Sequence, residues 1–415
     1  MPTLDPVTPP PALAAFEGFG IELEYMIADR ETLAVRPIAD ELLHGPDGEV
    51  VNEVDHDELA WSNELVRHVV ELKTNGPAES LQGLAEAFHA DLLEITRRLA
   101  PRGAMLLPTA MHPLFDPDRE TELWPYGQNE IYEAYDRIFG CAGHGWSNLQ
   151  SMHINLPFAD DEQFTRLHAA IRGVLPILPA LSAASPLQQG RPTGWLDTRM
   201  RYYRDNQRAV PEISGKVIPE AVGSIDEYHE RILAPMYEAI APHDPDGILA
   251  EDWLNSRAAI ARFERQAIEI RIIDLQECPA ADLAIARAVV ALVRRCYEED
   301  GVSLDALQAL ETGALARTLF EVSERGADAV VDDADWLAAF GLDEPMPAGD
   351  VWRSLRDRGW LDDGADNPTL AALLEGGPLA ARILAAAGTA PDADSIVRVY
   401  RELGQCLIEN RPFRC

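Results

Sequence analysis

The segment Gly20-Ile21-Glu22-Leu23-Glu24-Tyr25 alternates apolar and acidic side chains with a period of two. Successive side chains of a β-strand point to opposite faces, so the apolar residues share one face while Glu22 and Glu24 share the other. A strand of this kind buries one side and presents two carboxylates on the opposite side. The segment therefore predicts a sheet with one apolar face and one acidic face.

Three later segments repeat this pattern of an apolar face opposite a charged or polar face. They are residues 69–74 with Glu71, residues 151–156 with His153 and Asn155, and residues 267–272 with Glu269 and Arg271. A solvated sheet face would explain any one of them, but solvated strands usually carry threonine, lysine and mixed polar residues. Clustered carboxylates repel one another unless a cation lies between them, and their oxygens suit Mg²⁺ or Mn²⁺. The four segments together therefore predict divalent-metal chemistry on a phosphate substrate.

The composition narrows the class of protein. Among 415 residues, 47% are hydrophobic and 25% are charged, which is typical of a globular chain. The formal net charge of −35 argues against nucleic acid and anionic membranes as partners. The excess acid is interpreted as a solvated surface, with adaptation to high salt as the alternative.

Targeting and cysteine signals are weak. The five cysteines are scattered without a C-x-x-C pair, so neither a zinc site nor a disulfide framework is expected, and a reducing cytoplasm fits best. No apolar run reaches the roughly 20 residues needed to span a bilayer. Residues 1–15 are rich in proline and are expected to form a loose tail rather than a secretory signal.

Familiar phosphate-binding motifs are missing from the sequence. There is no G-x-x-x-x-G-K-[ST], no G-x-G-x-x-G after a strand and no H-E-x-x-H. Because Lys73 and Lys216 are the only lysines, a phosphate site must rely on arginine, backbone amides or a metal. The acidic run at residues 55–58 is interpreted as a hydrated loop.

Helical periodicity appears between and after these strands. Residues 80–99 repeat apolar side chains at helical spacing, and residues 162–181 predict a helix that bends near Pro176 and Pro179. Beyond Gly301 the sequence becomes almost wholly helical. We therefore divide the chain into a tail at 1–15, a main domain at 16–300 and a helical C-terminal region at 301–415 that packs on it.

Five segments, in the same order, resemble motifs of the glutamate–cysteine ligase family, in particular its bacterial carboxylate–amine ligase branch. They are residues 20–24 (GIELE), 70–74 (VELKT), 150–155 (QSMHIN), 181–199 with its LSAASP and GRPTG elements and Arg199, and 267–274 (AIEIRIID). Each motif alone is short, but five in the right order are specific. The resemblance extends from about residue 16 to 300, and the region after it has a helical character compatible with the family.

The resemblance implies an α+β fold like the catalytic domain of glutamine synthetase. In that fold a curved antiparallel sheet forms a funnel with its concave face, and helices lie outside. The implied activity is an ATP-dependent ligation of an amino-acid carboxylate, the γ-carboxylate of glutamate, to an amine, cysteine, through an acyl phosphate. A phosphotransferase on the same fold and an inactive nucleotide-binding homologue are the alternatives.

The same resemblance implies the surroundings of the reaction. Its cofactors are ATP and Mg²⁺ or Mn²⁺, and its partners are small amino-acid substrates, with no nucleic acid and no membrane. The enzyme would act in the cytoplasm, in glutathione biosynthesis. Its oligomeric state is left open, with a homo-oligomer as one option.

The resemblance also assigns roles to individual residues. The metal ligands implied are Glu22, Glu24, Glu64, Glu71, His153 and Glu269. Arg271 would reach the transferring phosphoryl group, and Arg199 would clamp a substrate carboxylate or phosphate, with Asp274 as a supporting residue. The nucleotide and substrate would also contact Gly190, Thr193 and Gly194.

Two positions depart from the family pattern. Asn155 stands where the carboxylate–amine branch commonly has a second histidine, and Leu114 follows His112-Pro113 where another histidine is often found. Both changes bear on the identity of the substrate more than on the ATP chemistry.

Overall fold

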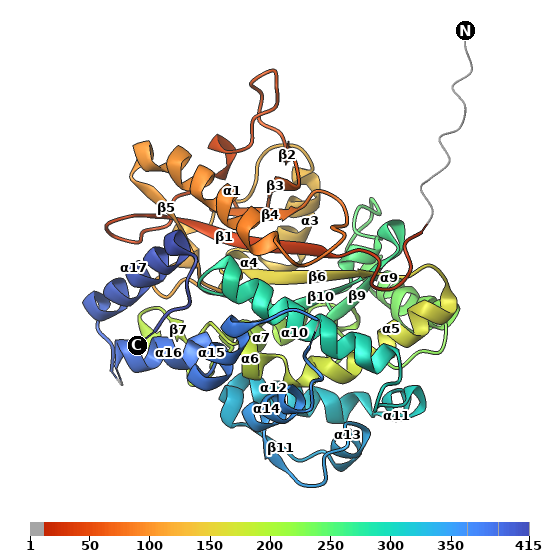
Figure 1. Cartoon of the computed structure of the whole chain (residues 1–415). Coiled ribbons are helices and arrows are strands. Elements are labelled where there is room, and N and C mark those ends of the chain that lie inside the picture. Colours follow the sequence, from red (N-terminus) through yellow and green to blue (C-terminus); the bar gives the residue numbers. More distant parts are fainter. Residues whose placement is uncertain (1–11, 363, 389, 415) are drawn as a thin grey trace.

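The computed structural model describes residues 12–362, 364–388 and 390–414 (Figure 1). Of the tail predicted at residues 1–15, residues 1–11 therefore lie outside the described part of the chain. An eight-stranded sheet forms the centre, with strands in the order β2-β3-β4-β1-β6-β10-β9 and with β5 paired to β1. The strands are β1 (Gly20–Asp29), β2 (Glu53–His56), β3 (Leu59–Asn63), β4 (Val69–Thr74), β5 (Ala104–Leu107), β6 (Ser151–Pro157), β9 (Ala259–Arg262) and β10 (Ala267–Asp274).

Every pairing in this sheet is antiparallel, and the register brings the four predicted segments together. Glu22 of β1 lies opposite His153 of β6, and Glu24 lies opposite Glu71 of β4. On the far side of β6, Glu269 of β10 lies opposite Asn155. Because directly opposed residues point to the same face, all these polar side chains share one face of the sheet.

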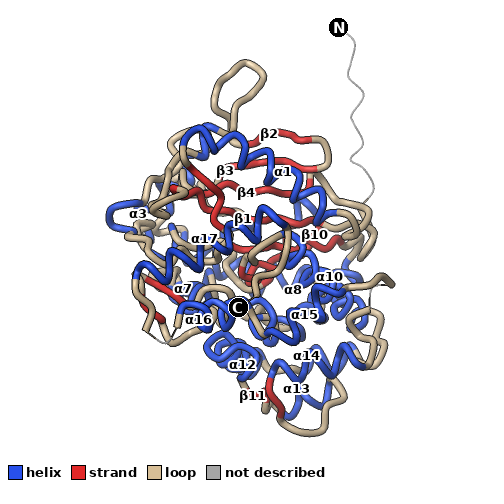
Figure 2. Tube along the Cα trace, turned by 60° about the vertical axis from the view of Figure 1, so that its left-hand side comes forward, coloured by secondary structure: helices blue, strands red, loops and turns tan. Residues whose placement is uncertain are grey.

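The other face is apolar and is covered by helices. Ile21, Leu23 and Leu72 are fully buried in one core with Phe88 and Leu92 of α1 (Leu84–Leu99). Figure 2 shows β2, β3, β4 and β1 following one another across the sheet, with α1 lying over them. Each such side chain contributes roughly 1.5–3 kcal/mol when it is buried, so this packing fixes which face of the sheet stays polar.

Helix α10 (Pro279–Tyr297) continues this layer, packing on α1 and on α5 (Asp161–Val174). As predicted, the helix that begins with α5 breaks at its prolines, into a 3₁₀ turn η3 (Leu175–Ile177) and α6 (Pro179–Ser182). The shorter elements before residue 300 include α2 (Pro117–Glu120), α3 (Asn129–Phe139), α4 (His144–Ser147), β7 (Leu187–Gln188), β8 (Arg191–Pro192), α7 (Thr198–Asp205), α8 (Ile225–Tyr228), α9 (Ala234–Ile240), η6 (Asp252–Leu254) and η7 (Phe263–Arg265).

Seven α-helices, the 3₁₀ turn η8 (Gly326–Asp328) and one small ladder follow residue 300 within the described ranges. They are α11 (Leu304–Ala309), α12 (Thr312–Arg325), β11 (Val330–Val331), α13 (Ala334–Ala339), β12 (Met346–Pro347), α14 (Ala348–Asp357), α15 (Pro368–Gly376), α16 (Leu379–Ala387) and α17 (Ala393–Glu409). The indole nitrogens of Trp336 and Trp352 donate hydrogen bonds of 2.8 Å to the carbonyl oxygens of Gly173 and Ile177. These helices thus pack directly on the α5–α6 segment.

The prediction of an α+β fold, with an antiparallel sheet and helices outside it, is confirmed. Within the described residues the sheet ends in the edge strands β2 and β9 and does not close into a barrel. No single described helix is long and apolar enough to cross a membrane. By length and composition alone, α15 and α16 pass that test as a pair bent by 52°.

Candidate functional site

The polar face of the sheet carries four glutamates around one histidine, and we call Glu22, Glu24, Glu71, His153 and Glu269 the acidic face. These residues are between 1% and 9% exposed. Their ligand atoms form two groups, Glu22–His153–Glu269 and Glu24–Glu71–His153, and within each group all atoms lie within 4.8 Å of one another. Both groups therefore have the geometry of a cation site, and they share the imidazole.

His153 lies between the two groups and offers one ring nitrogen to each. Nδ1 is 2.9 Å from Oε2 of Glu22 and 3.7 Å from Oε1 of Glu269. Nε2 is 3.7 Å from Oε1 of Glu24 and 2.9 Å from Oγ of Ser151. Burial by itself lowers the pKa of His153, but the hydrogen bond with Glu22 and the charges of Glu24 and Glu269 raise it to about 9. A positively charged imidazole thus offsets the surrounding carboxylates in the protein alone.

The pKa values of Glu22 and Glu71 are shifted in opposite directions. Burial raises the pKa of Glu22, yet the hydrogen bond and charge of His153 hold it at about 2. Burial and the neighbouring charge of Glu22 raise the pKa of Glu71, although Lys73 lies 3.3 Å away and Ser62 donates a 2.8 Å hydrogen bond to it. The carboxylates that are not paired with His153 therefore have the greater need for a further cation.

Glu64 lies beside this site, on the segment that joins β3 to β4, but belongs to neither ligand group. Burial, followed by the charges of Glu24 and Glu71, raises its pKa well above the usual range. The structure thus places this predicted ligand close to the acidic face, where it is unfavourable as an isolated anion.

Three arginines from β9, η7 and β10 border the acidic face. Arg271 lies 2.8 Å from Oε1 of Glu269, and Arg262 lies 2.9 Å from its Oε2. Arg265 lies 3.5 Å from Oε1 of Glu22. The sequence indicated Arg271 but not Arg262 or Arg265; their signal is the run Arg262-Phe263-Glu264-Arg265, which directly precedes the strand of Glu269.

Arg199, which was predicted to clamp the substrate, is buried and only 2% exposed. Its Nε donates a 2.6 Å hydrogen bond to Asp274, and its Nη1 donates to the carbonyl oxygen of Arg271 at 3.3 Å. Its Nη2 is buried without a hydrogen-bond partner among the described residues. One donor thus remains available, and the clamping role of Arg199 stays a prediction.

A β-bulge explains how Asp274 reaches Arg199. Ile270 pairs with Ile154 but Ile273 pairs with Met152, so Arg271 and Ile272 both lie opposite His153. The extra residue reverses the alternation, and Asp274 pairs with Ser151 on the polar face. Strict alternation in the sequence places Asp274 on the apolar face instead.

The predicted glycine loop forms a two-stranded ladder of β7 and β8, in which Gly190 and Gly194 have φ values of +75° and +85°. Oγ1 of Thr193 lies 2.6 Å from Oγ1 of Thr198, the residue next to Arg199. Within the described residues, no hydrogen bond or ion pair joins Gly190, Thr193 or Gly194 to the carboxylates. The loop is therefore linked to the site through α7, and its contact with a nucleotide stays a prediction.

Partly buried aromatic side chains lie along one border of the acidic face and were not indicated by the sequence. Tyr132 of α3 accepts a 2.9 Å hydrogen bond from Asn63 at the end of β3. Tyr135 packs against Trp146 and Trp253, with ring centroids 5.4 and 6.2 Å apart. The charge of Arg271 acts on Tyr135, which connects this aromatic group to the site. The helical spacing of Tyr132, Tyr135 and Phe139 was the available signal.

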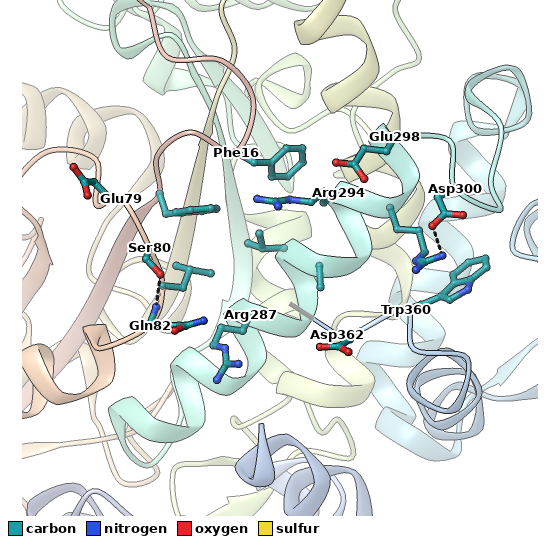
Figure 3. Close-up of a pocket in the computed structure, with 15 residues that line it drawn as sticks. Phe16, Glu79, Ser80, Gln82, Arg287, Arg294, Glu298, Asp300, Trp360 and Asp362 are labelled. Atoms are coloured by element: carbon teal, nitrogen blue, oxygen red, sulfur yellow. Dashed lines mark hydrogen bonds and ion pairs between the residues drawn. The ribbon is translucent and has the colours of Figure 1, made fainter. Parts of the chain in front are cut away.

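A separate pocket of about 340 Å³ lies between α10 and the segment before β1 (Figure 3). Its arginines already have partners: Arg295 pairs with Asp300 at 2.6 Å, and Arg294 lies over the ring of Phe16. It shares no residue with the acidic face. We therefore assign the functional site to the acidic face.

An antiparallel sheet that gathers carboxylates, an imidazole and arginines on one face defines a class of protein suited to binding cations and phosphates together. Comparison with known protein families agrees with that class. The model of glutamate-cysteine ligase family 2 (GCS2) matches residues 18–401, so the chain belongs to this family. The resemblance found in the sequence is thereby confirmed.

Individual relatives share between 15% and 38% of their residues with this chain in the aligned regions. An uncharacterized protein of Archaeoglobus fulgidus is 38% identical over 280 residues, covering 68% of this chain and 75% of the relative. A Nocardioides protein named "Putative glutamate--cysteine ligase 2-1" is 28% identical over 290 residues, covering 68% of each chain. The crystal structure of a glutamate–cysteine ligase from Francisella tularensis in complex with AMP superposes with a TM-score of 0.63 at 15% identity, covering 96% of this chain and 90% of that one. This last likeness concerns the fold alone.

Proposed function

We propose that this protein is an ATP-dependent ligase that joins the γ-carboxylate of glutamate to the amine of cysteine. The observation that carries the proposal is the pair of ligand groups on the acidic face, each within 4.8 Å, bordered by three arginines. Membership of the glutamate-cysteine ligase family supports ligase chemistry. The AMP in the Francisella ligase supports an adenine nucleotide as the second substrate.

The donor set fits Mg²⁺ or Mn²⁺, because it consists of carboxylate oxygens with one imidazole and contains no thiolate. Glu22 and Glu269 would hold one cation on the Nδ1 side of His153, and Glu24 and Glu71 would hold another on the Nε2 side. Glu64 is a further candidate ligand. Bound cations would offset the negative charge of the phosphates and of the attacking carboxylate.

The reaction we propose has two transfers. The γ-carboxylate oxygen of glutamate attacks the γ-phosphorus of ATP, and ADP leaves, which produces an acyl phosphate. The amine then attacks the acyl carbon, phosphate leaves, and the nitrogen loses a proton as the amide forms. Arg271 would donate to the transferring phosphoryl group, while Arg199 and the β7–β8 loop would hold the amino-acid substrate.

The planar guanidinium of Arg271 gives a test of this assignment. Arg271→Lys keeps the charge but loses the fork of donors, so ADP release should fall roughly ten- to a thousandfold. Thermal unfolding should change little, because the side chain is partly exposed. A rate within about twofold of the parent would show that Arg271 is structural.

Trapping with hydroxylamine tests the activated acid. With ATP, Mg²⁺ and hydroxylamine, glutamate should give a hydroxamate, whereas aspartate should give on the order of a hundredfold less, because its carboxylate is one methylene shorter and falls short of in-line attack. Hydroxamate from an unrelated acid, with none from glutamate, would retain the ligase chemistry and change the substrate. ADP formation without any trapped acid would indicate phosphate transfer to another acceptor.

The amine is tested separately by omitting hydroxylamine. Release of phosphate should then depend on cysteine, since the amine is what resolves the acyl phosphate. Phosphate release at the same rate without any amine would contradict the second transfer.

A further inference from the structure

The turn between β9 and β10 is fixed to the rest of the protein at its apolar end. The ring of Phe263 stacks on His229, with centroids 4.7 Å apart, and packs edge-on against Tyr228. Its backbone nitrogen donates a 2.9 Å hydrogen bond to Asp252. The backbone from which the neighbouring arginines extend is therefore held in a defined position beside the acidic face.

The two arginines that flank Phe263 differ in how firmly they are held. Arg262 is bound at both ends, by Asp252 at 3.1 Å and by Glu269 at 2.9 Å, with its side chain 17% exposed. Arg265 has a single ion pair among the described residues, the 3.5 Å contact with Glu22, and its side chain is 52% exposed. An exposed and long ion pair of this kind contributes little to stability, so Arg265 can leave Glu22 at small cost.

A divalent cation would compete with Arg265 for the same oxygen. Oε1 of Glu22 accepts from Arg265 and, at 3.1 Å, from Nδ2 of Asn155, while Oε2 is used by His153. A cation bound between Glu22 and Glu269 brings positive charge next to a guanidinium and weakens its attraction to Glu22. The displaced guanidinium would remain near the acidic face, where a nucleotide would place its phosphate oxygens, which are the groups that a planar fork of donors binds best.

We infer that Arg265 binds the β- or γ-phosphate of the nucleotide, and that Glu22 holds it at the site until a metal is present. The inference rests on the proposed function, because it requires ATP at the acidic face. It assigns Arg265 a role distinct from that of Arg262, which positions Glu269. It also explains why a half-exposed arginine points at a carboxylate that already has a charged histidine as its partner.

The inference predicts effects of opposite sign on metal and nucleotide binding. In Arg265→Gln, Mn²⁺ alone, titrated by electron paramagnetic resonance, should bind as tightly as in the parent or up to several-fold more tightly, since a competitor for Glu22 is gone. The Kd of ATP with Mg²⁺, measured by calorimetry, should rise about ten- to a hundredfold, as expected for loss of a charge-assisted hydrogen bond. The Kd of AMP, which lacks both outer phosphates, should stay within about twofold. Arg265→Lys should lie between the parent and Arg265→Gln.

Arg231→Gln is the matched control, because Arg231 is also half-exposed and paired with one glutamate, Glu227, away from the acidic face. It should change none of the three affinities. Equal weakening of ATP and AMP by Arg265→Gln, unchanged ATP affinity, or weaker Mn²⁺ binding would each overturn the inference about Arg265. Failure of the parent itself to bind ATP with Mg²⁺ would instead overturn the proposed function, and this inference with it.

Discussion

A Glu269→Gln variant should lose about a thousandfold or more of its ATP turnover, since it loses a carboxylate that no neighbour can replace. Glu269 is 1% exposed and belongs to one of the two ligand groups. Glutamine keeps its size, but the change removes the negative charge that faces Arg262 and Arg271. Arg271 then loses its ion pair and Arg262 keeps only that with Asp252, so two guanidinium groups lie next to the cation site with less negative charge beside them and repel the ion. The variant should therefore bind metal more weakly and also lose the ion pair that orients Arg271.

Two measurements separate these effects from misfolding. Mn²⁺ titration should show weaker binding in Glu269→Gln, and ADP release should be close to background, while circular dichroism should keep the parent's secondary structure. Glu298→Gln, at an exposed glutamate directly after α10 and outside the acidic face, is the control and should behave as the parent. Turnover of Glu269→Gln within about tenfold of the parent, with unchanged Mn²⁺ binding, would remove Glu269 from the metal site. Glu22→Gln should behave in the same way as Glu269→Gln.

Much of this site could be predicted from the sequence, because strand alternation is a local property. The period of two in residues 20–25 placed Glu22 and Glu24 on one face, and the structure places them there. The same reasoning placed Glu71, His153 and Glu269 on the polar faces of their own strands. Which strands are neighbours is not local: the acidic character shared by the four segments indicated that their faces would meet, and the family resemblance implied the same.

The bulge in β10 could not be predicted, because one extra residue leaves no mark in the alternation of the isoleucines around it. It reverses the direction of Asp274 and connects the end of the strand to Arg199. Arg265 was missed because the charged run of residues 262–265 does not show what it faces: its relation to Glu22 depends on β1 and β10 lying on either side of β6.

The ends of helices were also only partly predictable from the sequence. The periodicity predicted a helix from Ser80, but α1 begins at Leu84, because Gly83 has a φ of +86° and interrupts the helical backbone before it. The predicted end at Leu99 is correct, with Pro101 and Gly103 directly after it. The C-terminal region was expected to be almost wholly helical, and the short β11–β12 ladder is an exception, since four residues carry no detectable strand pattern.

Breaking the buried pair of Asp274 and Arg199 should lower the free energy of unfolding substantially. Asp274 is fully buried and accepts hydrogen bonds from the backbone of Ala184 at 2.7 Å, from Ser185 at 2.8 Å and from Arg199 at 2.6 Å. Asp274→Asn keeps the shape but leaves the charge of Arg199 buried without its counter-ion. Removing one partner of a buried pair costs about 3–5 kcal/mol, so the free energy of unfolding, measured with urea at neutral pH, should fall by that amount.

Arg199→Met should cost less, and its cost should depend on pH. Burial is the largest influence on the pKa of Asp274 and raises it, while Arg199 lowers it. Without Arg199, the folded-state pKa of Asp274 rises further above the value in the unfolded chain, and the carboxyl can avoid an unpaired charge by binding a proton. A group with a raised folded-state pKa contributes stability below its unfolded pKa and loses that contribution as pH rises through the folded pKa. The deficit of Arg199→Met relative to the parent should therefore shrink as the pH is lowered.

The double variant Asp274→Asn with Arg199→Met separates the pair from its surroundings. Both charges of the pair are removed, and Asp197 is the buried carboxyl that remains beside it. The free energy of unfolding should therefore exceed that of Asp274→Asn alone, because replacing both members of a buried pair is often close to neutral. Its deficit should also depend less on pH than that of Arg199→Met, since no carboxyl is left at residue 274 and Asp197, whose pKa is raised by burial and lowered by Arg199, is the neighbouring buried group that still titrates. The losses of unfolding free energy in the two single variants could instead add up to the loss in the double variant, with stability depending on pH as it does in the parent. In that case Asp274 and Arg199 would be acting independently. Their 2.6 Å contact would then contribute nothing to the stability of the fold.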